Sequence, residues 1–187
     1  ELRTPLHGVL GYAQILQRDA ATSPAQRENL EAIERCGQHL LTLINDILDM
    51  TRIEVGQMKL DIQATDLQQL LEDVRMIVAQ RADSKGLQLH VSLAPSLPSA
   101  VYTDAVKLKQ ILLNLLGNAV KFTQRGSVTL RAELNPDKHL VFEVTDTGIG
   151  IPADKIGSIF DPFHPAKAGQ VVDGTVLGLA ITQRLTG

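Results

Sequence analysis

The chain has 187 residues, of which 44% are hydrophobic and 21% charged, with 14 glycines, 8 prolines and one cysteine. This composition excludes a collagen, a disordered segment and a disulfide scaffold, and the length predicts one domain with a smaller helical addition. The net charge of −3 is spread along the chain, and therefore indicates neither a nucleic-acid nor a lipid partner. The lone Cys36 favours a reducing compartment, and no apolar run reaches the roughly 20 residues of a membrane span. Because the chain begins at Glu1 without Met, we expect it to be part of a longer protein.

Residues 1–60 carry the pattern of a helical hairpin. Apolar residues spaced by three and four predict a first helix from Pro5 to about Asp19. Ser23, Pro24 and Gln26 combine an N-cap, a proline in the first turn and a capping-box partner, so a second helix should begin there.

The second helix has an apolar stripe with the heptad spacing of a coiled coil. Its members are Leu30, Ile33, Gly37, Leu40, Ile44 and Ile47, widened by Leu41 and Leu48. One hairpin cannot cover so wide a stripe, so we predict that two copies form a dimeric four-helix bundle.

Residues 61–187 alternate between strand and helix patterns. We expect a strand at 60–63, a helix opened by a capping box of Asp66 and Gln69 and stopped at Gly86, and a strand at 87–91. A helix from Asp104 and an antiparallel hairpin of residues 127–134 and 139–146 follow. The buried face of the first of these helices should consist of Leu67, Leu70, Leu71, Val74, Ile77 and Val78. Together these elements predict an α+β sandwich, with helices on one face of a mixed or antiparallel sheet.

Two amides and an ammonium group share one stripe of the helix that begins near Asp104. Asn114, Asn118 and Lys121 are spaced by four and three residues, opposite the apolar positions. Amide oxygens suit a hydrated Mg²⁺ and a lysine suits phosphate oxygens. The alternative for this stripe taken alone is a solvated helix face.

Residues 146–150 form a glycine-rich turn directly after a strand. Asp146 has the same parity as the apolar residues of that strand, which predicts a carboxylate on the core side. Such a carboxylate needs a donor, which an adenine amino group would supply, and Gly148 and Gly150 would let the backbone approach a ligand. The alternative is a strand that ends in a turn capped by the aspartate.

Residues 174–181 lead from glycines into an apolar helix, whose first backbone N–H groups can bind phosphate. A simple junction between a loop and a helix would look similar. Phe160 and Phe163 precede a run at 164–173 with little apolar pattern, which indicates a flap over a site.

The order of these segments closely resembles the H, N, G1, F and G2 boxes of sensor histidine kinases. The segments are ELRTPL at 1–6, NLLGNAVKFT at 114–123, DTGIG at 146–150, FDPF at 160–163 and GTVLGLAI at 174–181. The resemblance covers nearly the whole chain and extends to hybrid sensor kinases of the RetS type. It implies a dimerisation and phosphotransfer hairpin at 1–60, followed at 61–187 by an ATP-binding sandwich of the histidine kinase, gyrase and Hsp90 type.

The resemblance also implies an ATP-dependent protein histidine kinase with ATP and Mg²⁺ as cofactors. Glu1 would be the acid/base residue beside a phosphorylated histidine, and Thr4 would orient water for removal of phosphate. Asn118 would coordinate Mg²⁺. The nucleotide would be bound by Asn114, Asn118, Lys121, Phe122, Asp146, Gly148, Gly150, Gly174 and Gly178.

The partners that the resemblance implies are a second copy of the chain and a response-regulator receiver domain, whose Asp receives the phosphoryl group. It places the chain in the cytoplasmic portion of a bacterial inner-membrane sensor.

The chain departs from the family pattern at several points. The acceptor histidine should precede Glu1, and His7 is expected to pack in the hairpin or lie on the surface. Val176 stands where the family has glycine, the flap is short, and the last strand region expected after Gly187 is missing. These departures keep a second interpretation open, in which the chain is a degenerate kinase that regulates another histidine kinase through its hairpin.

Overall fold

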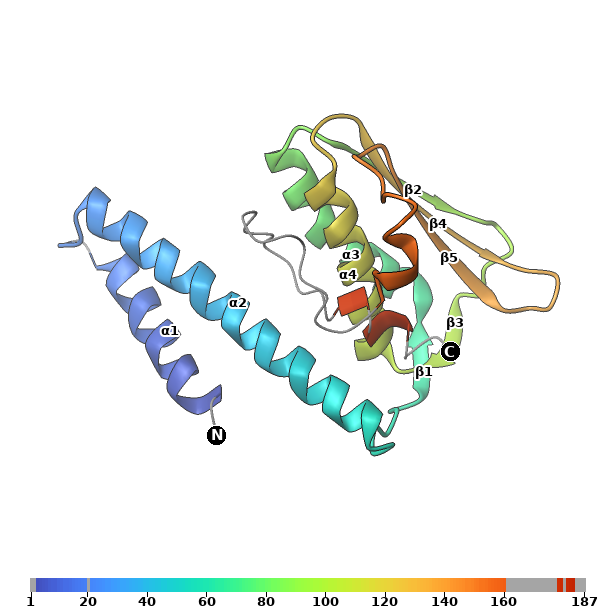
Figure 1. Cartoon of the computed structure of the whole chain (residues 1–187), viewed down its shortest axis with the longest axis horizontal. Helices are drawn as coiled ribbons and strands as arrows, with labels where there is room; N and C mark the ends of the chain where they lie inside the picture. Colours follow the sequence, from blue (N-terminus) through green and yellow to red (C-terminus); the bar gives the residue numbers. More distant parts are fainter. Residues whose placement is uncertain (1–2, 20, 161–177, 180, 184–187) are drawn as a thin grey trace. The chain divides into compact units, whose positions relative to one another are not determined.

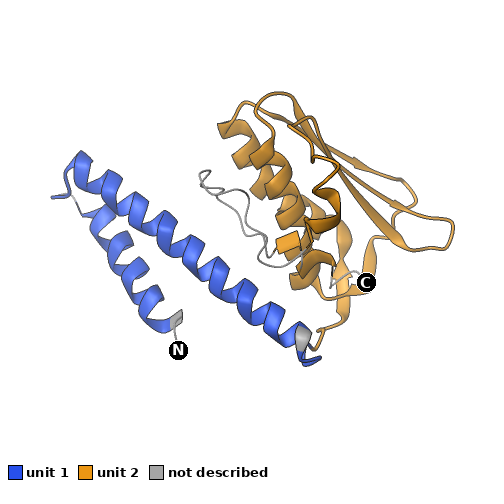
Figure 2. Cartoon of the chain, viewed as in Figure 1, with its two compact units in different colours: residues 1–58 blue, residues 59–187 orange. Residues whose placement is uncertain are grey.

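The computed structural model describes residues 3–19, 21–160, 178–179 and 181–183 (Figure 1). The predictions made for Glu1, Phe163, the flap at 164–173, Gly174 and Val176 lie outside the described residues. The chain divides into two compact units, Glu1–Met58 and Lys59–Gly187 (Figure 2). None of the described helices is both long enough and apolar enough to cross a membrane.

The first unit is a hairpin of two helices, α1 (Arg3–Arg18) and α2 (Pro24–Glu54). The predicted capping box at Ser23 is confirmed, because Ser23 Oγ accepts from the Gln26 backbone N–H at 3.3 Å and Gln26 Oε1 accepts from the Ser23 N–H at 2.9 Å. The helices approach closely at Gly37, where a Cβ atom would lie 2.6 Å from Leu10 Cδ2.

Only part of the apolar surface of the hairpin is buried between its two helices. The buried apolar residues are Leu10, Ala13, Leu41 and Met50. The α2 stripe leaves Ile33, Leu40, Ile47 and Leu48 between 40% and 47% exposed, and α1 leaves Val9, Tyr12, Ile15 and Leu16 between 49% and 72% exposed. One hairpin therefore leaves much of its predicted stripe uncovered.

The second unit contains two sheets and two long helices. Strand β1 (Gln63–Asp66) pairs antiparallel with β3 (Ala100–Thr103). The other sheet has the order β2-β4-β5, in which β2 (Gln88–Leu93) is parallel to β4 (Ser127–Leu134), and β4 is antiparallel to β5 (Leu140–Asp146). Helices α3 (Leu67–Ser84) and α4 (Ala105–Phe122) lie side by side against one face of this sheet (Figure 1). The predicted α+β sandwich with a mixed sheet is confirmed.

The core of this unit lies between the two helices and the three-stranded sheet. Its most deeply buried side chains come from α3, α4 and β4: Leu67, Leu71, Val74, Val78, Leu112, Leu116, Val128 and Leu130. Burial of so many aliphatic side chains is the main stabilising contribution to this unit. It also fixes the position of α4 against the sheet.

Three expectations for the start of the unit were wrong. The first strand occupies 63–66 rather than 60–63, because its register is set by β3, a strand that the pattern did not predict. Asp66 does cap α3 through the Gln69 N–H, but the Gln69 side chain donates to Asp73 instead of completing a capping box. Ile77 is 36% exposed, since it lies at the edge of the buried face.

The later element boundaries agree with the sequence pattern. Gly86 adopts the left-handed conformation (φ +68°) just after α3, as expected of a glycine that stops a helix. Asp104 caps α4 through the Lys107 N–H at 3.0 Å. After β5 the chain forms an exposed segment with one short 3₁₀ helix, η1 (Ile156–Ser158).

Candidate functional site

Helix α4 presents the predicted polar stripe on the side opposite its buried face. Asn114, Asn118 and Lys121 are all half-buried, whereas Leu112 and Leu116 are fully buried. The Asn118 amide has no hydrogen-bond partner within the described part of the chain. The Lys121 Nζ lies 4.9 Å from the centroid of the Phe122 ring. The stripe therefore offers the Asn118 amide for binding a ligand, and the Lys121 ammonium group lies on the same stripe.

The turn after β5 docks on the carboxyl end of α4. A Cβ atom on Gly148 would lie 2.6 Å from the carbonyl oxygen of Phe122, a backbone atom that cannot move away easily. Only glycine fits this contact, which brings the predicted turn at 146–150 next to the predicted stripe on α4. Gly150 adopts φ +66°, where glycine is favoured over other residues.

The Asp146 carboxylate lies at the end of β5. Its Oδ1 accepts from the Gly148 backbone N–H at 2.8 Å, which leaves Oδ2 with capacity to accept from a ligand. Asp146 lies on the core side of the sheet, as predicted, because it is paired with the fully buried Val128 of β4. The residue is exposed there, so the expected burial of its carboxylate was wrong. The carboxylate finds its donor in the turn itself, at the Gly148 N–H.

Thr147 joins the same turn to the loop that follows α4, a role that the sequence analysis missed. Its Oγ1 accepts from the Ser127 N–H at 3.0 Å and donates to the Arg125 carbonyl at 3.3 Å. Gly126, with φ +114°, is packed directly against this hydroxyl. The position of the threonine between Asp146 and Gly148 was the only signal in the sequence.

The helical residues 178–179 and 181–183 contact the middle of α4. Asn114 Nδ2 donates to Thr182 Oγ1 at 3.1 Å, and Thr182 Oγ1 donates to the Gly178 carbonyl at 2.9 Å. A Cβ atom on Gly178 would overlap the Asn114 amide, at 2.6 Å from its Cγ. The structure thus brings Gly178 and Asn114 together, as the predicted site requires, and adds Thr182 to them.

Both ends of α4 are held by charged side chains. At the carboxyl end, Lys85 Nζ donates to the carbonyls of Val120 and Lys121 at 2.8 and 2.9 Å. A cation there also interacts favourably with the helix dipole.

At the amino end of α4, burial of Asp104 would by itself raise the pKa of its carboxyl group. Hydrogen bonds from the backbone N–H groups of Lys107, Asp61 and Val106 outweigh the effect of burial and hold that pKa below its ordinary value.

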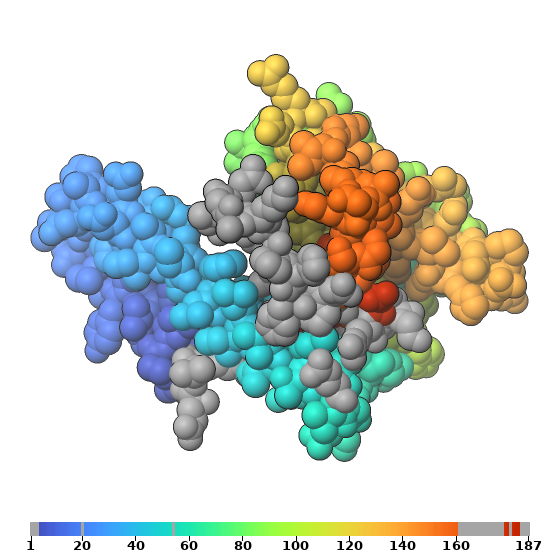
Figure 3. All heavy atoms as spheres, in the orientation of Figure 1, coloured from blue at the N-terminus to red at the C-terminus, as the bar shows by residue number. Residues whose placement is uncertain are grey.

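The segment after β5 is an exposed surface that contains several large apolar side chains. Ile149, Ile151 and Ile156 are 76%, 53% and 54% exposed. Figure 3 shows residues near 150–160 in orange on the viewed face of the molecule. Residues 149–156 thus carry apolar surface directly beyond the Asp146 turn.

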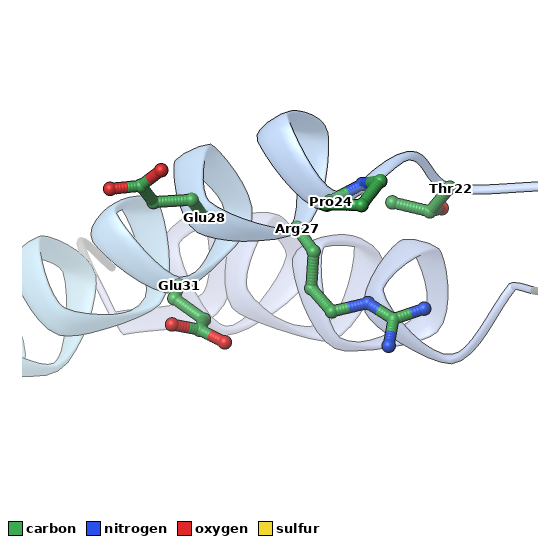
Figure 4. Close-up of a pocket in the computed structure, with 5 residues that line it drawn as sticks. All are labelled: Thr22, Pro24, Arg27, Glu28 and Glu31. Atoms are coloured by element: carbon green, nitrogen blue, oxygen red, sulfur yellow. The ribbon is translucent and has the colours of Figure 1, made fainter.

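Glu1 and Thr4 are the two predicted catalytic residues of the hairpin. Thr4 is exposed in the first turn of α1, and Glu1 lies outside the described residues. The hairpin turn carries a surface hollow of about 290 Å³ lined by Thr22, Pro24, Arg27, Glu28 and Glu31 (Figure 4). Its charged side chains, Arg27, Glu28 and Glu31, point in different directions (Figure 4). Across the described residues, no cluster of three or more His, Cys, Asp and Glu is suited to hold a metal ion.

Two protein families match the two units. Residues 1–56 match the His Kinase A (phospho-acceptor) domain, and residues 103–187 match the Histidine kinase-, DNA gyrase B-, and HSP90-like ATPase. The chain belongs to the sensor histidine kinases. The kinase resemblance of the five boxes is thereby confirmed, whereas the RetS-type likeness stays a prediction.

Similar proteins include a sensor protein of Escherichia coli and a hybrid kinase of Dictyostelium discoideum. The chain is 40% identical over 188 residues to the aerobic respiration control sensor protein ArcB of Escherichia coli, covering 99% of this chain and 24% of ArcB. It is 39% identical over 191 residues to hybrid signal transduction histidine kinase B of Dictyostelium discoideum, covering 99% of this chain and 10% of that protein. The chain thus spans at most about a quarter of these two relatives.

A crystal structure of full-length ShkA in complex with AMPPNP has a similar fold. Its TM-score with this chain is 0.79 at 38% identity, over 99% of this chain and 38% of ShkA. The likeness covers both units of this sensor kinase.

Proposed function

We propose that this chain is the working core of a two-component sensor histidine kinase. Its second unit binds ATP with Mg²⁺, and the γ-phosphoryl group passes to a histidine that precedes Glu1 on the hairpin. The observation that carries this proposal is the contact between Gly148 and the Phe122 carbonyl, since it joins the Asp146 turn to the stripe of Asn114, Asn118 and Lys121. AMPPNP is an ATP analogue, so its complex with the similar kinase ShkA adds support.

The residues of this unit fit a magnesium nucleotide chemically. Asp146 Oδ2 would accept from the adenine amino group, while Gly148 fixes Oδ1. Asn118, whose amide has no partner among the described residues, would bind Mg²⁺, which neutralises phosphate charge when bound. Asn114, Lys121 and Phe122 would line the phosphate side. We assign Gly150, Gly174 and Gly178 to the walls of the cleft.

The hairpin would supply both the histidine that accepts the phosphoryl group and the carboxylate that accepts the proton. Attack of the imidazole nitrogen on the γ-phosphorus breaks the bond to the β-phosphate oxygen, releases ADP and leaves a proton for the Glu1 carboxylate. The phosphoryl group would then pass to an aspartate of a response-regulator receiver domain. Thr4, which is exposed on α1, would orient water when the same hairpin removes that phosphate.

The uncovered apolar face of the hairpin supports a dimer. A second copy would cover side chains such as Ile33, Leu40 and Ile47, which are 45–47% exposed in a single chain. Removal of this surface from water on association is favourable. We therefore assign the hairpin to homodimerisation through a four-helix bundle.

The same face also supports the second candidate, a degenerate kinase whose hairpin pairs with another histidine kinase and inhibits it. That candidate predicts hetero-association through residues 1–60 and no phosphorylation of the chain itself. A pull-down with sister kinases from the source cell, with and without the hairpin substitution Leu40→Glu, distinguishes the two candidates.

The direct test of kinase function uses the longer chain that includes the residue before Glu1. We expect labelling from γ-labelled ATP with Mg²⁺, loss of the label in Asn118→Ala, and retention in Asn29→Ala, an exposed asparagine of α2. Label that is absent from the folded longer chain, or unaffected by Asn118→Ala, would contradict the proposal.

A further inference from the structure

Thr182 is a buried residue of the short helical stretch 181–183, with only 8% of its surface exposed. It lies one helical turn after Gly178 and contacts Asn114 of α4. The family resemblance assigns roles to Gly178 and Asn114, but none to Thr182. Its hydrogen bonds nevertheless determine how the Asn114 amide is presented.

The direction of these hydrogen bonds follows from the chemistry of a hydroxyl group, which has one hydrogen and can accept as well. That hydrogen goes to the Gly178 carbonyl at 2.9 Å. The group of Asn114 that faces Thr182 Oγ1 at 3.1 Å must then be a donor, its NH₂ group. The Asn114 carbonyl oxygen is consequently turned away from Thr182 and toward the α-carbon of Gly178.

We infer that Thr182 is a positioning residue for nucleotide binding, which holds the Asn114 amide with its nitrogen on the Thr182 hydroxyl and its oxygen beside Gly178. This inference rests on the proposed function, because it concerns the same site. An amide turned the other way round would place its NH₂ group beside Gly178, and an NH₂ group cannot accept a hydrogen bond from the hydration shell of a cation. The hydroxyl also links Asn114 of α4 to Gly178 through its two hydrogen bonds.

The test compares Thr182→Val, which keeps the shape and removes the hydroxyl, with Thr182→Ser, which keeps the hydroxyl. We expect the valine variant to bind Mg²⁺-AMPPNP about threefold to tenfold more weakly, the range that loss of one neutral hydrogen bond gives. Binding of adenosine, which has no phosphate, should stay unchanged, and the serine variant should restore Mg²⁺-AMPPNP affinity. Equal weakening of both ligands, no weakening, or failure of serine to restore binding would overturn the inference.

A second measurement does not depend on nucleotide binding or on the folding of the valine variant. The side-chain NH₂ signal of Asn114, identified by its loss in Asn114→Asp, should exchange slowly with solvent in the unsubstituted chain and in Thr182→Ser. Rapid exchange in the unsubstituted chain would overturn the inference. Absence of AMPPNP binding by the folded unsubstituted chain would instead reject the proposed function, so the two failures are distinguishable.

Discussion

Gly148 meets the backbone of Phe122 so closely that a methyl group on its α-carbon would come within 2.6 Å of the Phe122 carbonyl oxygen. This contact is the junction between the turn that carries Asp146 and the helix that carries Asn118. Neither partner can give way without a shift of backbone. The geometry of the site therefore depends on the absence of one side chain.

Gly148→Ala should separate the turn from α4. We expect a loss of about 1–3 kcal/mol in the free energy of unfolding, the range typical of overpacking, together with weaker nucleotide binding. Urea unfolding and calorimetry measure the two effects. Gly157→Ala is the matched control, since a Cβ atom there has nothing within 4 Å. Equal behaviour of the two variants would contradict the proposed junction.

Asp104 should make the stability of the second unit depend on pH. Its carboxylate accepts from the Lys107 and Asp61 N–H groups, and its pKa is lowered in the folded chain. A lowered pKa means that the stabilisation is present above the unfolded pKa, near 4, and is lost as the pH falls through the folded pKa. We expect Asp104→Asn to cost about 1 kcal/mol at pH 7 and progressively less below pH 4. A difference that is constant between pH 7 and pH 3 would contradict this account.

Lys85 should stabilise the carboxyl end of α4. Lys85→Met removes two hydrogen bonds to the carbonyls of Val120 and Lys121 and a cation at the helix terminus. Because such bonds contribute modestly in water, we expect a loss of about 1–2 kcal/mol in the free energy of unfolding. Lys155→Met, at an exposed lysine beyond β5, serves as the control and should leave the unfolding midpoint unchanged.

The hairpin should lose its partner when a charge is placed in its apolar face. Leu40 is 47% exposed in the single chain and would be buried in the proposed dimer, so Leu40→Glu should shift the chain from dimer to monomer in sedimentation velocity. Gln38→Glu adds the same charge at an exposed polar position of α2 and should leave the dimer intact. A chain that is monomeric before substitution would refute the dimer.

The sequence predicts best what local chemistry determines. The start of α2 follows from Ser23 and Gln26, and the end of α3 follows from Gly86, because caps and left-handed turns act within a few residues. Strand β1 was misplaced and β3 missed, because four-residue strands owe their register to a partner distant in the chain.

In the candidate site, too, local patterns predicted where residues lie on their elements, whereas contacts between distant parts of the chain were missed. Box order predicted Asn114, Asn118 and Asp146 as site residues, and helical spacing placed the two amides on one stripe of α4. Strand parity placed Asp146 on the correct face of the sheet, opposite Val128, but could not give its exposure, since parity reports the face and not how much of it is covered. Lys85 and Thr182 could not be found from the pattern, because their contacts with α4 cross 35 and 68 positions of sequence.

The most direct measurement of the central claim is calorimetric titration of Mg²⁺-ATP into this chain, beside Asp146→Asn and the control Asp154→Asn. Asp146 Oδ1 already accepts from Gly148, and an asparagine cannot offer two accepting oxygens, whereas Asp154 is an exposed residue beyond the turn. We predict binding in the micromolar range, near −8 kcal/mol, that is lost in Asp146→Asn and kept in Asp154→Asn. No binding by a chain that circular dichroism shows to be folded, or equal binding by all three proteins, would contradict the account.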